Sequence, residues 1–174
     1  MNYREIWKTP IAEFFSKKPV HDELLNILNQ TDLNFLSDES NIFTLWVKNC
    51  CAEYLNKFYT SYKNIHITSG YLSIQKYGES FKTHAHDRAD IAAVYYADTN
   101  SNHPNLELID TRPAHKFNSI TTFNNNTKCN DVKIFEVKPE TGKLVLFPAH
   151  VLHSVDANLL QQSRYAFSMN IILD

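Results

Sequence analysis

The spacing of apolar residues changes near residue 65, and this change limits the possible fold more than any other feature of the sequence. Before it, residues 22–28 and 43–62 space their apolar side chains by three and four, which predicts two amphipathic helices. After it, the apolar runs are short, rich in β-branched and aromatic residues, and bounded by polar turns, which predicts strands. The strands expected from these runs are residues 65–73, 91–97, 106–109, 132–137, 143–147 and 165–173.

Several short strands after a helical segment are typical of a β-sandwich or barrel with helices packed on its outside. We therefore expect a mainly β fold with N-terminal helices, and a length of 174 residues fits a single domain, 1–174. In this domain residues 1–64 would give helical support and residues 65–174 would form the β core. Residues 111–131 show no periodicity, which predicts a mobile segment or a lid over a site, with Arg112 at its base as a candidate contact for an anionic substrate.

The composition excludes several classes of function. The chain has only three glycines, so neither a G-x-G-x-x-G turn nor a Walker-type phosphate loop can be written from it. A net charge of -2 offers no basic surface, so we expect no nucleic-acid partner. No apolar run approaches the roughly 18 residues of a membrane helix, so we expect no membrane association. Cys50, Cys51 and Cys129 form neither a disulfide framework nor a metal knuckle, which favours a cytoplasmic location.

Three of the eight histidines form a candidate metal site. His84 and His86 lie two apart, and residues two apart on a strand project from the same face, where two imidazoles can share one metal ion. His153 follows a strand that ends at Pro148 and is the third candidate. An H-x-H pair is a weak indication by itself, because half-buried polar pairs on a sheet face look the same. The histidines expected to be structural or surface residues are His21, His66, His103 and His115.

The last predicted strand has one polar and one apolar face. Arg164, Ala166, Ser168 and Asn170 alternate with Tyr165, Phe167 and Met169. A strand of this kind lines either water or a polar pocket. Arginine at its start suits a carboxylate ligand, because the planar guanidinium can bind both carboxylate oxygens at once.

Taken together, these residues resemble the Fe(II)/2-oxoglutarate oxygenases. More narrowly, the chain resembles a largely uncharacterised group of these oxygenases from bacteria and their phages. The matching motifs are Gly78…His84-x-His86, the paired tyrosines Tyr95-Tyr96, Gly142…Phe147-Pro148…His153, Arg164…Asn170, and a Thr-Pro in the opening apolar stretch, residues 6–11. The likeness covers most of the chain, and the motifs are specific as a set although each is weak alone.

The resemblance implies a double-stranded β-helix, the jelly roll that cupins share, with Fe(II) bound by His84, His86 and His153. It implies that Arg164 pairs with the distal carboxylate of 2-oxoglutarate and that Ser73 and Gln75 also contact this co-substrate. Ser168 and Asn170, on the polar face that starts at Arg164, are expected at the same site. The implied reaction hydroxylates an unknown small-molecule or peptide substrate and converts 2-oxoglutarate and O2 to succinate and CO2.

One departure from the family leaves the metal ligands open. The wider family uses two histidines and one carboxylate, and here the middle position holds His86. Asp87 or Asp90 could supply the carboxylate, either as a ligand or as the acceptor of an imidazole N–H. The spacing favours His86, because Asp87 would point to the opposite face of a regular strand.

Two other classes of protein remain as alternatives. A cupin has the same G-x5-H-x-H start and would bind its metal through the three histidines and Asp90, without 2-oxoglutarate. A β-domain with no metal would bring His84, His86, His153 and Arg164 together without a purpose, which is costly if they are buried. Arg164 favours the oxygenase, because a buried arginine beside the third histidine has an obvious role only if an anionic co-substrate binds.

Overall fold

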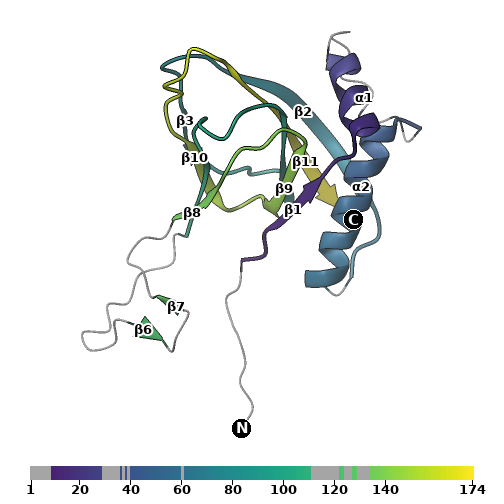
Figure 1. The fold of residues 1–174 in the computed structure, drawn as a ribbon. Coiled ribbons are helices and arrows are strands. Elements are labelled where there is room, and N and C mark those ends of the chain that lie inside the picture. The colour runs from purple at the N-terminus through teal and green to yellow at the C-terminus, as the bar shows by residue number, and fades with distance from the viewer. Residues whose placement is uncertain are drawn as a thin grey trace.

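The computed structural model describes residues 9–28, 36, 38, 40–59, 61–110, 122–123, 127–128 and 134–174. Two helices, α1 and α2, lie on the N-terminal side of the chain and are followed by most of the strands (Figure 1). The helices are α1 (Lys18–Leu28) and α2 (Ile42–Phe58). The strands are β1 (Ala12–Phe15), β2 (Ile65–Gln75), β3 (Phe81–His84), β4 (Ile91–Asp98), β5 (Leu106–Ile109), β6 (Thr122–Phe123), β7 (Thr127–Lys128), β8 (Ile134–Val137), β9 (Lys143–Pro148), β10 (Leu152–Val155) and β11 (Arg164–Leu173).

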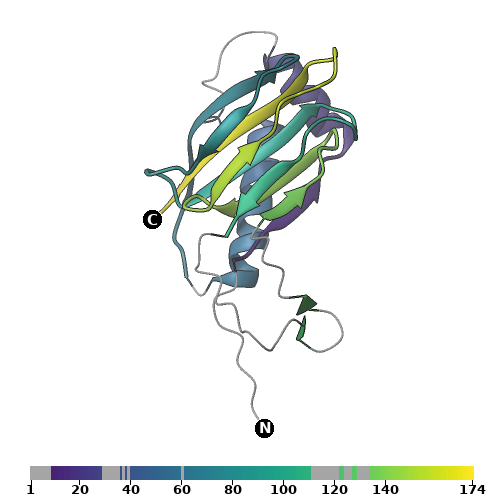
Figure 2. The ribbon, with the colours of Figure 1, turned by 90° about the vertical axis from the view of Figure 1, so that its left-hand side faces the viewer.

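Two antiparallel sheets face each other. The larger has the strand order β1-β9-β4-β11-β2 and the smaller has the order β3-β10-β5-β8. Apolar side chains from both sheets, such as Val94 and Phe147 on the larger and Leu106 and Val155 on the smaller, form one core between them. Both helices cover the outer face of the larger sheet and form a second core with it (Figures 1 and 2). The predicted mainly β fold with outer helices is therefore confirmed.

Strand β4 lies in the centre of the larger sheet and is buried on both faces. Tyr95 points toward the helices, and its hydroxyl is 2.7 Å from Ser16 Oγ and 2.8 Å from His21 Nδ1. Tyr96 points into the core between the sheets. A strand covered on both sides is apolar throughout, which explains why residues 91–97 show no alternation of polar and apolar side chains.

The structure differs from the sequence expectation at several elements. The segment before residue 65 also contributes β1, which pairs with residues 143–146 of β9 and places Phe14 opposite Leu144. Strands β3 and β10 were not among the predicted ranges, because each has only four residues, at least two of them polar, and so shows no apolar run. Helix α2 ends at Phe58 rather than at residue 62, because Tyr59 adopts an extended conformation. Helix α1 begins at Lys18, four residues before the predicted start.

Several predicted features can be located and others cannot. His21, His66 and His103 are hydrogen bonded to Tyr95, Asp174 and Gln162, respectively, as expected of structural histidines. Apart from the two-residue strands β6 and β7, the predicted lid at residues 111–131 lies outside the described residues, as do Arg112, His115 and Cys129. Within the described chain, no helix is long and apolar enough to span a membrane.

Glycines form the turns that precede β3, which carries His84, and β9. Gly78 has φ 79° and Gly142 has φ 88°, a left-handed conformation that side chains with a Cβ rarely adopt. The Gly142 N–H donates to the Tyr96 carbonyl and its own carbonyl accepts from Ser16 N–H, so this turn connects β4, β9 and β1.

Replacing Gly142 with alanine is expected to lower the free energy of unfolding by about 1–2 kcal/mol, because alanine is strained at this φ. The new Cβ would also meet Ser16 Oγ at 3.3 Å. Urea unfolding of the purified protein measures the loss. Asparagine tolerates the left-handed region, so Gly142→Asn should lose less. Equal stability of the alanine variant and the wild type would contradict the strain at this turn.

Candidate metal centre

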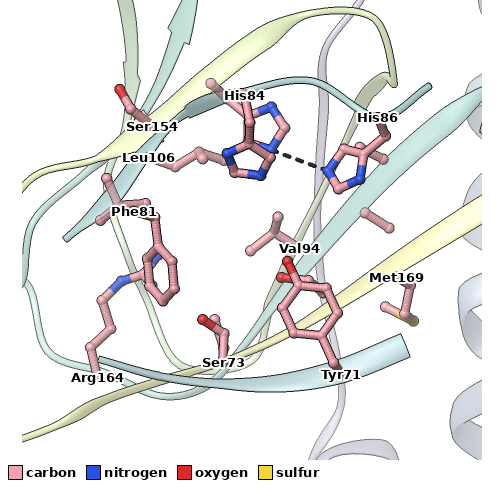
Figure 3. Close-up of a pocket in the computed structure, with 16 residues that line it drawn as sticks. Tyr71, Ser73, Phe81, His84, His86, Val94, Leu106, Ser154, Arg164 and Met169 are labelled. Carbon is pink, nitrogen blue, oxygen red and sulfur yellow. Dashed lines mark hydrogen bonds between the residues drawn. The ribbon is translucent and has the colours of Figure 1, made fainter. Parts of the chain in front are cut away.

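A cavity opens between the two sheets and contains the predicted metal ligands (Figure 3). Its empty space, including open solvent at its mouth, is about 490 Å³. His84 and His86 lie on one side of the cavity, and Tyr71, Ser73 and Arg164 lie on the opposite side. Among the described residues that line the cavity there is no aspartate or glutamate.

His84 and His153 come together because their strands are paired. They are direct partners in the antiparallel register of β3 and β10, and their ring centroids are 4.2 Å apart. Strand β10 follows the turn after Pro148, in which Val151 N–H donates to the Pro148 carbonyl. This turn brings the chain back so that His153, which is 5% exposed, points into the cavity.

His86 reaches the same place from a loop and not from a strand. Strand β3 ends at His84, so the expectation that both residues project from one regular strand is wrong. The ladder stops because β10 begins at Leu152 and offers no strand residue opposite His86. Instead the His86 N–H donates to the Ala149 carbonyl in the β9–β10 turn at 3.0 Å, which holds the imidazole beside His153.

The three imidazoles can hold one metal ion. One ring nitrogen of each lies within 4.8 Å of the others. His84 Nδ1 donates to the Lys82 carbonyl at 2.7 Å and His153 Nδ1 donates to the Val151 carbonyl at 2.9 Å. A carbonyl oxygen only accepts, so in the neutral rings of His84 and His153 the Nε2 atom carries the lone pair that a metal would bind, which is the usual arrangement of ligating histidines.

The cavity keeps two of these imidazoles neutral. Burial lowers the pKa of His153 to about 4. Burial also lowers the pKa of His86, and the nearby His84 lowers it further by a smaller amount. Metal ions bind only the neutral imidazole, so at neutral pH neither His86 nor His153 has to give up a positive charge before it can bind. With His153 Nδ1 protonated, the 3.3 Å contact between the two Nε2 atoms is a hydrogen bond donated by His86 (Figure 3).

Acid is expected to destabilise the metal-free protein through His153. Its pKa is about 4 when folded and about 6.5 when unfolded, so the unfolded chain binds more protons between these values. The contribution of His153 to stability is present above pH 6.5 and is lost as the pH falls to 4, by at most about 3 kcal/mol. Urea unfolding at pH 7 and pH 5 with a chelator present measures it. The difference in the free energy of unfolding between pH 7 and pH 5 should be smaller in His153→Ala than in the wild type. An unchanged difference would show that His153 does not cause the loss of stability in acid.

The structure assigns Asp90 another role. Asp90 Oδ2 accepts from Leu173 N–H at 2.8 Å and its own N–H donates to the Ile171 carbonyl, so Asp90 attaches the end of β11 to the start of β4. Asp87 is exposed in the turn after His86. Within the described chain, the group that could hold a metal here consists of His84, His86 and His153 alone.

Arg164 is 2% exposed and has no carboxylate partner among the described residues. Its guanidinium carbon is 5.1 Å from the centre of the Tyr96 ring, and its Nε is buried without a hydrogen bond. Arg164 lies near the Tyr96 hydroxyl and partly offsets the rise that burial causes in the pKa of Tyr96, yet the hydroxyl makes no hydrogen bond of normal geometry. A buried, unpaired guanidinium is costly, so this arrangement indicates a place for an anion.

The remaining predicted residues divide into two groups. The alternation of β11 is confirmed from Arg164 to Ser168, since these two residues line the cavity while Phe167 faces the helices; Met169, predicted on the apolar face, also contributes to the cavity lining. Ser73 lines the cavity from β2. Gln75 and Asn170 lie outside the cavity lining; the Gln75 amide donates to two backbone carbonyls and the Asn170 amide donates to Ser69 Oγ.

Two residues at or next to the cavity were missed from the sequence as site residues. Tyr71 lines the cavity from β2 and is 46% exposed at its edge. Tyr96 approaches Arg164 from β4. In the sequence, the paired tyrosines indicated only a strand. That Tyr96 is buried beside Arg164 could not be predicted, because it depends on the register between β4 and β11.

The model of the family described as "Putative 2OG-Fe(II) oxygenase" matches residues 70–170, more than half of the chain. This range includes the three histidines, Ser73 and Arg164. The chain belongs to this family. It is therefore a member of a family of oxidoreductases that use 2-oxoglutarate and iron. No curated protein matches the sequence.

Solved structures show the same fold at low sequence identity. A prolyl-4-hydroxylase from Pseudomonas putida is 12% identical with a TM-score of 0.60, over 92% of this chain and 85% of that chain. HygX from Streptomyces hygroscopicus with iron bound is 10% identical with a TM-score of 0.63, over 94% and 82% of the two chains. HygX with nickel and 2-oxoglutarate bound is 11% identical with a TM-score of 0.62, over 94% and 81%. The predicted double-stranded β-helix is confirmed by these matches.

Proposed function

We propose that this protein is an Fe(II)/2-oxoglutarate-dependent oxygenase that hydroxylates a small-molecule or peptide substrate in the cavity between its sheets. One observation carries the proposal: three imidazoles with metal-binding spacing and a buried, unpaired arginine line the same cavity. Family membership and the HygX complex with nickel and 2-oxoglutarate support it, because that protein holds both groups in the same fold.

In this proposal the Nε2 atoms of His84, His86 and His153 hold the metal. Backbone carbonyls of Lys82 and Val151 orient two of the rings before the metal arrives. His86 must move its proton from Nε2 to Nδ1 to take part, which breaks its hydrogen bond to His153. When bound, Fe(II) supplies the oxidising chemistry that converts 2-oxoglutarate and O2 to succinate and CO2.

Arg164 would bind the distal carboxylate of 2-oxoglutarate. The guanidinium and the Tyr96 hydroxyl are buried donors in need of acceptors, and the Ser73 hydroxyl lines the same side of the cavity. A charge-assisted, bidentate contact in this water-poor place would position the co-substrate with its other end toward the histidines. Three neutral imidazoles leave the metal with one more unit of positive charge than a centre with a carboxylate ligand, which favours the dianionic co-substrate.

A cupin-type metal protein without 2-oxoglutarate is the less supported function. Its fourth ligand would be Asp90, and that carboxylate is hydrogen bonded to the Leu173 N–H on another part of the sheet. It would also leave Arg164 buried without a charge to bind.

Anaerobic titration of the Fe(II)-loaded protein with 2-oxoglutarate tests the proposal. We expect the weak visible charge-transfer band of such complexes, followed by formation of succinate when O2 is admitted. Succinate in place of 2-oxoglutarate is the matched control and should give no band. Iron bound in stoichiometric amount with neither a band nor succinate formation would favour the metal protein that does not use 2-oxoglutarate.

A further inference from the structure

Gln75, at the end of β2, has one end of its amide bonded and the other end without a partner. Its side chain is fully buried, and its Nε2 donates to the carbonyls of Glu79 and Asp156, each at 2.7 Å. These carbonyls belong to the turn between β2 and β3 and to the connection between β10 and β11. Gln75 therefore links two chain segments, the β2–β3 turn and the β10–β11 connection, through hydrogen bonds.

The orientation of this amide is determined by its partners. Both groups bonded to Nε2 are carbonyl oxygens, which only accept, so a flipped amide would lose two hydrogen bonds and place three oxygens together. Gln75 Oε1 must therefore face away from them. It is buried and has no hydrogen-bond partner. A buried acceptor without a donor is destabilising, which calls for an explanation.

Arg164 is the residue directly opposite Gln75 in the antiparallel register of β2 and β11. Side chains of such partners project from the same face, with Cβ atoms about 4.5–5.5 Å apart. Arg164 Nε is also buried without a partner, and it is a donor. An orphaned acceptor and an orphaned donor thus lie on adjacent positions of the same sheet face, beside the cavity.

We infer that Gln75 is a positioning residue for Arg164: its Oε1 accepts the Arg164 Nε–H when 2-oxoglutarate occupies the cavity. The inference rests on the proposed function and replaces the expectation that Gln75 contacts the co-substrate itself. When the Nε–H is hydrogen bonded to Gln75 Oε1, the two terminal nitrogens of the guanidinium remain free to bind the two oxygens of one carboxylate. In the structure the guanidinium lies over the Tyr96 ring, and Gln75 Oε1 and Arg164 Nε are not hydrogen bonded to each other.

Binding of 2-oxoglutarate to the nickel-loaded protein, measured by titration calorimetry, tests this role. Gln75→Met has a similar length and removes the acceptor, so it should raise the dissociation constant for 2-oxoglutarate about tenfold, the usual effect of one hydrogen bond to a charged group. The affinity for nickel should stay within about twofold. Arg164→Lys keeps the charge and lacks the Nε–H, so adding Gln75→Met to it should change the dissociation constant less than about twofold.

Asn158→Ala is the matched control for damage to the same buried region. Asn158 donates to the backbone carbonyl of Gln75 and to that of Gln162, so its loss loosens the two segments without removing Oε1. The inference is overturned if Asn158→Ala weakens 2-oxoglutarate binding as much as Gln75→Met does. It is also overturned if Gln75→Met has the same effect with lysine at position 164 as with arginine.

A measurement on the unaltered protein keeps the inference testable if Gln75→Met does not fold. In the zinc-loaded protein, the Arg164 Nε–H proton resonance, assigned by its loss in Arg164→Lys, should move downfield when 2-oxoglutarate is added. A resonance that stays in place while 2-oxoglutarate binds would refute the role of Gln75. If the wild type does not bind 2-oxoglutarate at all, the proposed function itself fails, and the two failures are distinguished.

Discussion

Arg164→Ala is expected to weaken binding of 2-oxoglutarate at least about 100-fold and to leave metal binding within about twofold. Arg164 is 2% exposed and is the cation that lines the cavity among the described residues. Truncation removes a buried, charge-assisted pair, an effect of about 3–5 kcal/mol. Calorimetric titration of the nickel-loaded variant with 2-oxoglutarate measures the loss, and a separate nickel titration measures metal affinity.

The same substitution should raise the stability of the empty protein. A buried guanidinium without a counter-charge is destabilising, so its removal is expected to increase the melting temperature of the metal-free variant. Arg88→Ala is the control, because Arg88 is exposed in the turn after His86 and should change neither property. Unchanged affinity for 2-oxoglutarate in Arg164→Ala would show that Arg164 does not bind the carboxylate of this co-substrate.

His153→Ala is expected to lower the affinity for Fe(II) or Co(II) at least about 100-fold, and to abolish succinate formation with it. His153 is the most buried of the three histidines and is the partner of both others, opposite His84 in the sheet and 3.3 Å from His86. Its loss leaves two ligands, one of them on a loop. Titration with Co(II), followed by its visible absorption, measures the affinity.

His150→Ala is the matched control, since His150 lies three residues earlier and is exposed. It should bind metal as the wild type does. Stoichiometric, tight metal binding by His153→Ala would show that the ion lies elsewhere and would contradict the three-histidine centre.

Much of the fold could be predicted because its elements have local signatures. Residues 106–109 were predicted exactly as β5, and β2, β4, β9 and β11 were predicted to within two residues at each end. The exceptions were short or marginal elements. Strand β1 consists of four residues whose apolar pattern acquires meaning only through pairing with β9.

The candidate site shows the same division. His153 and the polar face of β11 followed from spacing alone, since alternation along a strand is a property of the backbone. The sequence argument for His86 assumed a regular strand, and this reason does not hold: His86 lies beyond the end of β3, and its N–H donates a hydrogen bond to the Ala149 carbonyl. Gln75 and Ser73 looked equivalent in sequence, but only Ser73 lines the cavity.

The sequence by itself determined which residue types could form a metal and anion site, because side-chain chemistry and strand periodicity are local. Only the tertiary structure decided which of them meet. The change of spacing near residue 65 predicted strands. However, the position of His86 depends on where the β3–β10 ladder ends, and the Asp90 carboxylate is occupied by a hydrogen bond from Leu173 N–H at the end of β11. The register of β2 against β11 set Gln75 beside Arg164. Register and ladder ends depend on contacts between segments far apart in the chain, and no local pattern contains them.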